Sequence, residues 1–276
     1  MIKGSTAMEQ ELARIETAHK VAWITLARPA ARNSLSLAML DRLHHAIETL
    51  GRDDQVHVIV IAAEGPAFCA GHDLKELTAA RAEADRGRAF FTETMDRCAR
   101  LMMSIVQCPK PVIASVQGIA TAAGCQLVAT CDLAVASEEA RFATPGVNIG
   151  LFCSTPMVAL SRNVSRKQAM KMLLTGEMIP ASEALAQGLV SDVVAAEDLR
   201  AETEKLARAI AEKSPATLRI GKEAFYRQVE MPLPEAYAFT AQVMVENMLE
   251  PDAEEGIGAF VEKRVPEWRP LGGGEG

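Results

Sequence analysis

Apolar residues along the chain alternate between short continuous runs and helix-spaced patterns. The short runs predict buried strands at residues 21–26, 56–61, 111–118 and 132–137. A helix is expected to begin at about Ser36, a residue type that caps helices, because apolar residues recur on one face as far as Leu50. This repeated order of strand, loop and helix favours an α/β coil of strands with outer helices.

The rest of the pattern is helical. An arginine-rich helix is expected around 80–107, with Arg81, Arg86 and Arg88 on a solvated face. Past about residue 195, proline-separated helices are expected at 197–213, 216–229, 234–249 and 252–264. We therefore divide the chain into an N-terminal leader or tag-like segment (1–18), a strand-and-helix core (19–195) and a C-terminal helical subdomain (196–276).

Composition excludes several classes of protein. The 276 residues include 36 acidic and 29 basic side chains, a net charge of −7, which argues against a nucleic-acid-binding protein. No apolar run reaches the roughly 18 residues of a membrane span. The six cysteines lack CxxC spacing and the five histidines lack metal-site spacing, so we expect no metal. A reducing compartment follows: the cytoplasm, or the mitochondrial matrix in a eukaryotic source.

Two loops rich in small residues carry the candidate chemistry. Ala70-Gly71-His72-Asp73 and Ala122-Ala123-Gly124-Cys125 each leave an expected strand. Small residues let a ligand approach the backbone, and amides at a helix start point outward. Two such amides aimed at one point would polarise a carbonyl oxygen. The alternative is a pair of tight turns that bind no ligand.

Several ordered motifs identify a family. They are ITLxRPxxRNSLS at 24–36, GPAFCAGHDLKEL at 65–77, GIATAAGCQL at 118–127, LTGE at 174–177 with AxxxGLV at 184–190, and GIxAFVEKR at 256–264. Together they resemble the enoyl-CoA hydratase/isomerase (crotonase) superfamily from about residue 20 onward. The resemblance implies a spiral of ββα turns whose C-terminal helices form homotrimers, often stacked as homohexamers.

The resemblance also implies a ligand and its site. The ligand would be an acyl-CoA thioester, with coenzyme A as part of the substrate and no permanently bound cofactor. The backbone amides of His72 and Ala123 would form an oxyanion hole for a thioester enolate. Contacts to coenzyme A would come from Arg28, Ala70, Leu74 and Lys75, and from Phe260 and Lys263 on the C-terminal helix, which the resemblance allows to belong to a neighbouring subunit.

The chain departs from the family pattern at two positions. Family hydratases use two glutamates, and the alignment places Gln126 and Gly146 there. Neither residue exchanges a proton near neutral pH, so ordinary hydratase activity is in doubt. Three possibilities stay open: an enzyme that proceeds through an enolate, a decarboxylase-like enzyme that uses His72, and an acyl-CoA-binding protein without hydratase activity. A nucleotide-dependent dehydrogenase is disfavoured because the chain has neither GxGxxG nor GxxxxGK[ST].

Other residues near these motifs are weaker candidates. Thr144 and Asn148 have side chains that could hydrogen-bond an acyl substituent. Cys153 and Ser154 have nucleophilic side chains, but neither has a base beside it in the sequence.

Overall fold

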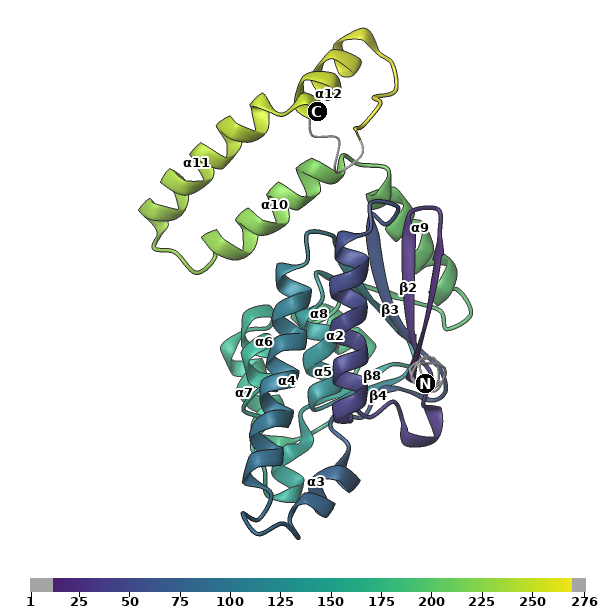
Figure 1. Ribbon diagram of the computed structural model, residues 1–276, viewed down its shortest axis with the longest axis vertical. Helices are drawn as coiled ribbons and strands as arrows, with labels where there is room; N and C mark the ends of the chain where they lie inside the picture. The colour runs from purple at the N-terminus through teal and green to yellow at the C-terminus, as the bar shows by residue number, and fades with distance from the viewer. Residues whose placement is uncertain (1–11, 270–276) are drawn as a thin grey trace, which may run out of the picture.

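The computed structural model describes residues 12–269, in which the strands form two sheets (Figure 1). The strands are β1 (Ala13–Ala18), β2 (Val21–Leu26), β3 (Val58–Ala63), β4 (Ala67–Cys69), β5 (Val112–Val116), β6 (Ile119–Thr121), β7 (Leu133–Ser137), β8 (Arg141–Ala143), β9 (Ile179–Pro180) and β10 (Asp192–Val194). The larger sheet has the order β1-β2-β3-β5-β7-β10 and is parallel except between β1 and β2. The smaller sheet has the order β4-β6-β8-β9, and β9 alone is antiparallel.

Helices connect the strands and form the C-terminal end of the described chain. They are the 3₁₀ turns η1 (Pro29–Ala31) and η2 (Pro145–Ile149) and the α-helices α2 (Leu37–Arg52), α3 (Leu74–Ala80), α4 (Arg88–Gln107), α5 (Ala123–Thr130), α6 (Pro156–Asn163), α7 (Arg166–Thr175), α8 (Ala181–Gln187), α9 (Leu199–Ala211), α10 (Pro215–Gln228), α11 (Leu233–Leu249) and α12 (Pro251–Glu262). Ser36 caps α2 as the sequence predicts, because its hydroxyl accepts a hydrogen bond from the amide of Met39.

The chain winds as a spiral in which each turn adds one strand to each sheet. β3, β5 and β7 lie in the larger sheet, and each is followed directly by β4, β6 or β8 in the smaller one. A helical segment then leads to the next turn. The ββα spiral that the resemblance implies is therefore present.

The larger sheet is buried on both faces. Ile59 and Ile61 of β3 pack with α2, α4 and α5 in one core, whereas Val58 and Val60 pack against α9 in another. Successive residues of a strand point to opposite faces, which is why the sequence of β3 is continuously apolar. Because α9 covers the sheet, it belongs to the core, although the boundary at residue 195 assigned it to the helical subdomain.

Two further expectations differ from the structure. Residues 13–18, placed in the leader segment, form β1 and pair with β2, while residues 1–11 lie outside the described part of the chain. The helix expected at 80–107 is broken. α3 ends at Ala80 and α4 begins at Arg88, after Gly87, whose φ of +86° suits glycine.

The last three helices project away from the spiral as an arm (Figure 1). Their bounds agree with the sequence prediction to within about two residues, the usual uncertainty of helix ends. Lys222 of α10 fastens the arm, because its ammonium group donates hydrogen bonds to the carbonyl oxygens of Ile105 and Lys110 and pairs with Asp132.

Candidate active site

Three parallel strands of the smaller sheet end at one edge. β6 lies between β4 and β8, with Cys69 beside Ala120 and Thr121 beside Ala143. The segments that follow these strands contain His72, Ala123 with Gln126, and Gly146. Parallel strands deliver the loops after them to the same edge of a sheet, so the sheet gathers the four predicted catalytic positions.

Hydrogen bonds hold the loop after β4 against the start of α2. The amide of Leu35 donates to the carbonyl of Gly71 over 2.8 Å, and the amide of Ala70 donates to the carbonyl of Arg32 over 3.1 Å. Asp73 caps α3 through the amide of Lys75 and accepts the hydroxyl of Ser34. The backbone at His72 is therefore fixed from both sides.

The loops after β4 and β6 touch each other. Thr121 Oγ1 donates to the carbonyl of Ala70, and a Cβ atom added to Gly71 would lie 3.4 Å from the amide nitrogen of Ala123. Ala122, which precedes α5, has a φ of +51°, a conformation that costs free energy for a residue with a side chain. Such strain persists where the surroundings determine the backbone, and here the amide of Ala122 donates to the carbonyl of Ala143.

The amides of His72 and Ala123 have no acceptor among residues 12–269. His72 lies outside the regular strands and helices, and Ala123 is the first residue of α5, where amides have no partner within the helix. The structure thus places two unpaired main-chain donors on adjoining loops.

The His72 imidazole makes no hydrogen bond with the described residues although both of its ring nitrogens are buried. Burial lowers the pKa of this imidazole, and the backbone of Leu35 partly opposes that shift. The ring is therefore neutral near pH 7.

Gln126 lies on α5 and is only 6% exposed. The thiol of Cys98, on α4, lies 3.8 Å from its Oε1 atom. The residue that the resemblance aligns with the first family carboxylate is thus a buried amide whose oxygen faces a neutral hydrogen-bond donor.

Gly146 leaves no room for a larger residue. Its amide donates to Cys153 Sγ over 3.3 Å. A Cβ atom at this position would lie 2.7 Å from the carbonyl oxygen of Leu151 and 2.9 Å from Cys153 Sγ. A glutamate here requires the segment 151–153 to move.

The cysteines near the site are poor nucleophiles. Burial raises the pKa of Cys69, Cys98 and Cys125 to about 12 in each case, and it also raises that of Cys153. The thiolate is the reactive form, so these side chains stay inert near neutral pH.

Four of the residues expected to contact coenzyme A lie near one another. Arg28 Nη1 donates to Ser36 Oγ over 3.4 Å at the start of α2. Ala70, Leu74 and Lys75 surround the start of α3, and Glu76 joins the two helices by accepting the amide of Leu37. Leu74 and Lys75 are exposed.

The other two expected contacts lie elsewhere. Phe260 lies on α12 and Lys263 directly follows this helix, at the end of the molecule opposite α3 (Figure 1). The ring of Phe260 is 85% exposed. A single chain therefore does not bring these residues to Lys75.

Thr144 and Asn33 have contacts or burial that the sequence analysis did not bring out. Thr144 follows β8, and its buried hydroxyl has no hydrogen-bond partner among the described residues. Asn33, in a motif of the family, donates to the carbonyl oxygens of Glu64 and Ala67 and so ties the loop after β2 to β4. Only the burial of Thr144 singles it out, whereas the motif itself pointed to Asn33.

Residues 12–269 contain neither a cluster that could hold a metal ion nor a helix that could cross a membrane. No group of three or more histidine, cysteine or acidic side chains is arranged to hold a metal ion in that range. Among the described helices, none combines the length and the apolar character that crossing a membrane requires.

Comparison with known proteins decides the family. The profile of the family "Enoyl-CoA hydratase/isomerase" matches residues 16–270. The chain belongs to the enoyl-CoA hydratase/isomerase family. Crotonase-family enzymes act on CoA thioesters without a permanent cofactor.

Within the enoyl-CoA hydratase/isomerase family, the chain is similar to "Enoyl-CoA hydratase domain-containing protein 3, mitochondrial" of Rattus norvegicus. The two are 51% identical over 245 residues, which are 89% of this chain and 80% of the rat protein. The crystal structure of the human protein of that name superposes with a TM-score of 0.89 at 49% identity, covering 93% of this chain and 100% of that one. A Mycobacterium smegmatis enoyl-CoA hydratase structure gives 0.88 at 51% identity, covering 93% and 98%. The crotonase fold is thus established.

Proposed function

We propose that the protein is an enzyme that binds acyl-CoA thioesters and stabilises their enolates between the amides of His72 and Ala123. The observation that carries this proposal is the pair of main-chain amides, on adjoining loops, that have no acceptor within residues 12–269. When the α-carbon loses a proton, the electron pair of the broken bond moves onto the thioester oxygen. Two fixed donors stabilise that charge, and the loss of one such donor raises a barrier by roughly 3–4 kcal/mol.

The reaction proposed is not ordinary hydration. Gln126 and Gly146 provide no group that activates water or protonates the α-carbon at neutral pH. Each general acid or base contributes on the order of 10²–10⁴ to a rate, so hydration should be severely reduced. A protein that only binds acyl-CoA would share this site but show no turnover.

A decarboxylase-like reaction is the second candidate, and the His72 ring favours it. In that reaction the bond between the α-carbon and a carboxylate breaks, CO₂ leaves, and the electron pair forms the same enolate. No base is needed to form the enolate, but the α-carbon must then receive a proton. The buried, unpartnered imidazole of His72 can deliver one that it draws from water.

The test combines binding with turnover. Calorimetry should detect butanoyl-CoA binding, while crotonyl-CoA hydration should be slow and methylmalonyl-CoA decarboxylation measurable. His72→Gln keeps the backbone amide. Binding should survive in this variant, and decarboxylation should fall by about 10²-fold if the imidazole transfers the proton. If the protein bound no CoA thioester, both the enzyme hypothesis and the binding-protein hypothesis would be wrong.

We also propose that the protein assembles as a homotrimer or homohexamer through the arm. Leu249 is 80% exposed and lies with other exposed apolar side chains on α10–α12. Such surfaces are typical of contacts between subunits. A second copy would also bring Phe260 and Lys263 to the coenzyme A contacts near Lys75. Sedimentation should show the oligomer, and Leu249→Glu should weaken it; a monomeric wild-type protein would contradict the proposal.

The proposed location is the cytoplasm, or the mitochondrial matrix in a eukaryotic source. All six cysteines are unpaired and buried, as expected for a protein of a reducing compartment. The word "mitochondrial" in the names of the relatives describes those proteins.

A further inference from the structure

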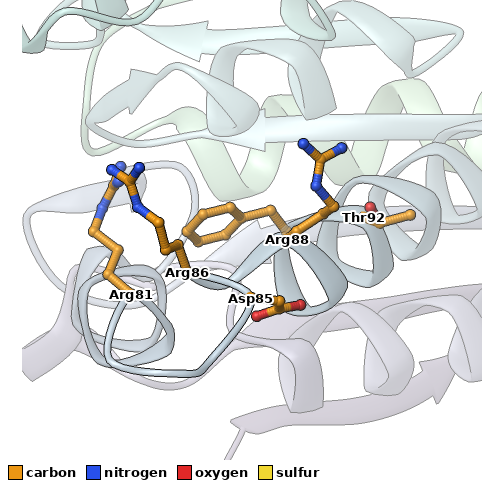
Figure 2. Close-up of a pocket in the computed structure, with 6 residues that line it drawn as sticks. Arg81, Asp85, Arg86, Arg88 and Thr92 are labelled. Carbon is orange, nitrogen blue, oxygen red and sulfur yellow. The ribbon is translucent and has the colours of Figure 1, made fainter.

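A concave site lies between the end of α3 and the beginning of α4, apart from the candidate active site (Figure 2). It is a hollow of about 430 Å³, open to solvent and lined by Arg81, Asp85, Arg86, Arg88, Phe91 and Thr92. We call it the arginine hollow. Figure 2 shows the three arginine side chains directed to the same side, whereas the Asp85 carboxylate points away from them.

The three guanidinium groups have no counter-ion in the part of the chain that the structure describes. None of them forms an ion pair with any residue between 12 and 269. Asp85 is engaged elsewhere, because its two oxygens accept the amides of Gly87 and Ala89 and cap α4. In a protein with a net charge of −7, this local excess of positive charge attracts anions.

The hollow also has rigid and apolar parts. The Cζ atom of Arg81 lies 5.4 Å from the centroid of the Phe91 ring, a cation–π arrangement. Gly87 fixes the turn, since a Cβ atom there would meet Phe91 and the carbonyl of Ala80. The Arg81 guanidinium held in this way presents paired N–H donors that match a carboxylate or a phosphate.

The arginine hollow lies within reach of the candidate active site. α3 starts two residues after His72 and ends beside Arg81, and seven helical residues span about 10 Å. α4 leads from Arg88 to Cys98, the neighbour of Gln126, over about 15 Å. Two helices therefore connect the hollow to the candidate site, α3 to His72 and α4, through Cys98, to Gln126.

We propose that the arginine hollow binds an anionic group of the acyl-CoA ligand, a carboxylate or a phosphate, at a distance of about 10–15 Å from the thioester carbonyl. A carboxylate would be the far end of a long acyl chain, and a phosphate would belong to coenzyme A. This inference rests on the proposed function, because it takes the thioester to be held at His72 and Ala123.

Calorimetry with three probes tests the proposal: coenzyme A, decanoyl-CoA and decanedioyl-CoA, which adds a terminal carboxylate to the same chain. The test variant is Arg81→Gln/Arg86→Gln. The matched control is Arg100→Gln/Arg166→Gln, in which both arginines are exposed and lie outside the hollow, on α4 and α7. Circular dichroism establishes that both variants are folded.

If the hollow binds the acyl carboxylate, the test variant loses about tenfold or more in affinity for decanedioyl-CoA and keeps its affinity for decanoyl-CoA. If it binds a phosphate, affinity for all three probes falls together while the control stays unchanged. Unchanged affinity of the test variant for every probe would overturn the inference. Binding of decanoyl-CoA to the wild type reports on the proposed function separately, so the two proposals fail in different ways.

Discussion

The thiol of Cys98 and the side-chain oxygen of Gln126 face each other across 3.8 Å, joining α4 to α5, the helix that begins at Ala123. The contact leaves the Nε2 group of Gln126 as a donor and provides no proton acceptor for catalysis. The carboxamide does not titrate, so replacing it with a carboxylic acid would introduce a titratable group on α5.

Gln126→Glu should gain crotonyl-CoA hydratase activity. A carboxylate there can activate water, and a single such group contributes on the order of 10²-fold. Burial raises the pKa of a carboxyl group above its usual value of about 4.3, so the gained rate should rise with pH as the group ionises. Stopped-flow absorbance measures the hydration, and Gln126→Met is the control. An equal rate in both variants would contradict the assignment.

Gly146→Ala should destabilise the protein by about 1–3 kcal/mol, because the added methyl group meets Leu151 and Cys153. In contrast, Gly221→Ala on α10 has open space around it and should stabilise the helix by roughly 0.5–1 kcal/mol. Urea unfolding measures both. If Gly146→Ala had the same free energy of unfolding as the wild type, the segment 151–153 would be able to move aside at little cost, contrary to what its contacts indicate.

Lys222→Ala should lower the free energy of unfolding by about 3–5 kcal/mol, because it leaves Asp132 without its buried partner. Tyr226→Phe removes the hydroxyl that donates to Asp132 over 2.8 Å and should cost about 1.5–3 kcal/mol. Lys205→Ala, which breaks an exposed pair with Glu202, should cost less than about 1 kcal/mol. Equal effects of the two lysine variants would show that the arm is not fastened by this contact.

Acid should destabilise the ligand-free protein through His72. The native pKa of this imidazole is lowered, whereas its ordinary value is 6.5. Below pH 6.5 the unfolded chain binds a proton that the folded chain does not. The free energy of unfolding therefore decreases as the pH is lowered, until the native imidazole is protonated as well. His57, whose pKa is also lowered by burial, adds to this slope. Unfolding between pH 5 and 7 should therefore show a shallower pH dependence in His72→Gln.

Iodoacetamide at pH 8 should modify the native cysteines very slowly and all six rapidly in urea. Their pKa values are raised by burial, to about 12 for Cys98 and Cys125. Mass spectrometry of peptides gives the rate for each residue, with the unfolded protein as the internal standard. Fast native labelling of Cys98 would show that the neighbourhood of Gln126 opens to solvent.

Local sequence pattern predicted most elements because it reflects burial directly. The continuous apolar run of β3 follows from its two buried faces, and the cap at Ser36 from a local hydrogen bond. The place of α9 was missed since an amphipathic helix has the same pattern on a sheet or on an arm. The break before Arg88 was missed because its residues are mostly good helix formers, and Gly87 alone signals the turn.

The candidate site was located from motifs, but its contacts were not. Cys98 and Gln126 are 28 positions apart, and no local pattern links residues on two different helices. The steric block at Gly146 depends on Leu151 and Cys153 folding back over it, which the spacing alone does not show. Arg81, Arg86 and Arg88 come together because the chain turns between α3 and α4, and the sequence pattern did not predict this turn.

The parallel order of β4, β6 and β8 has a consequence for how such a protein can change. The amide pair is set by the main-chain ladder between these strands, so substitutions in the surrounding side chains leave it in place. A change of side chain at position 126 would thus alter proton transfer while the two amides of the proposed oxyanion hole stay in place. Ligand binding and the reaction that follows it are then separable properties of the fold, and Leu151 and Cys153 close position 146 to a larger side chain.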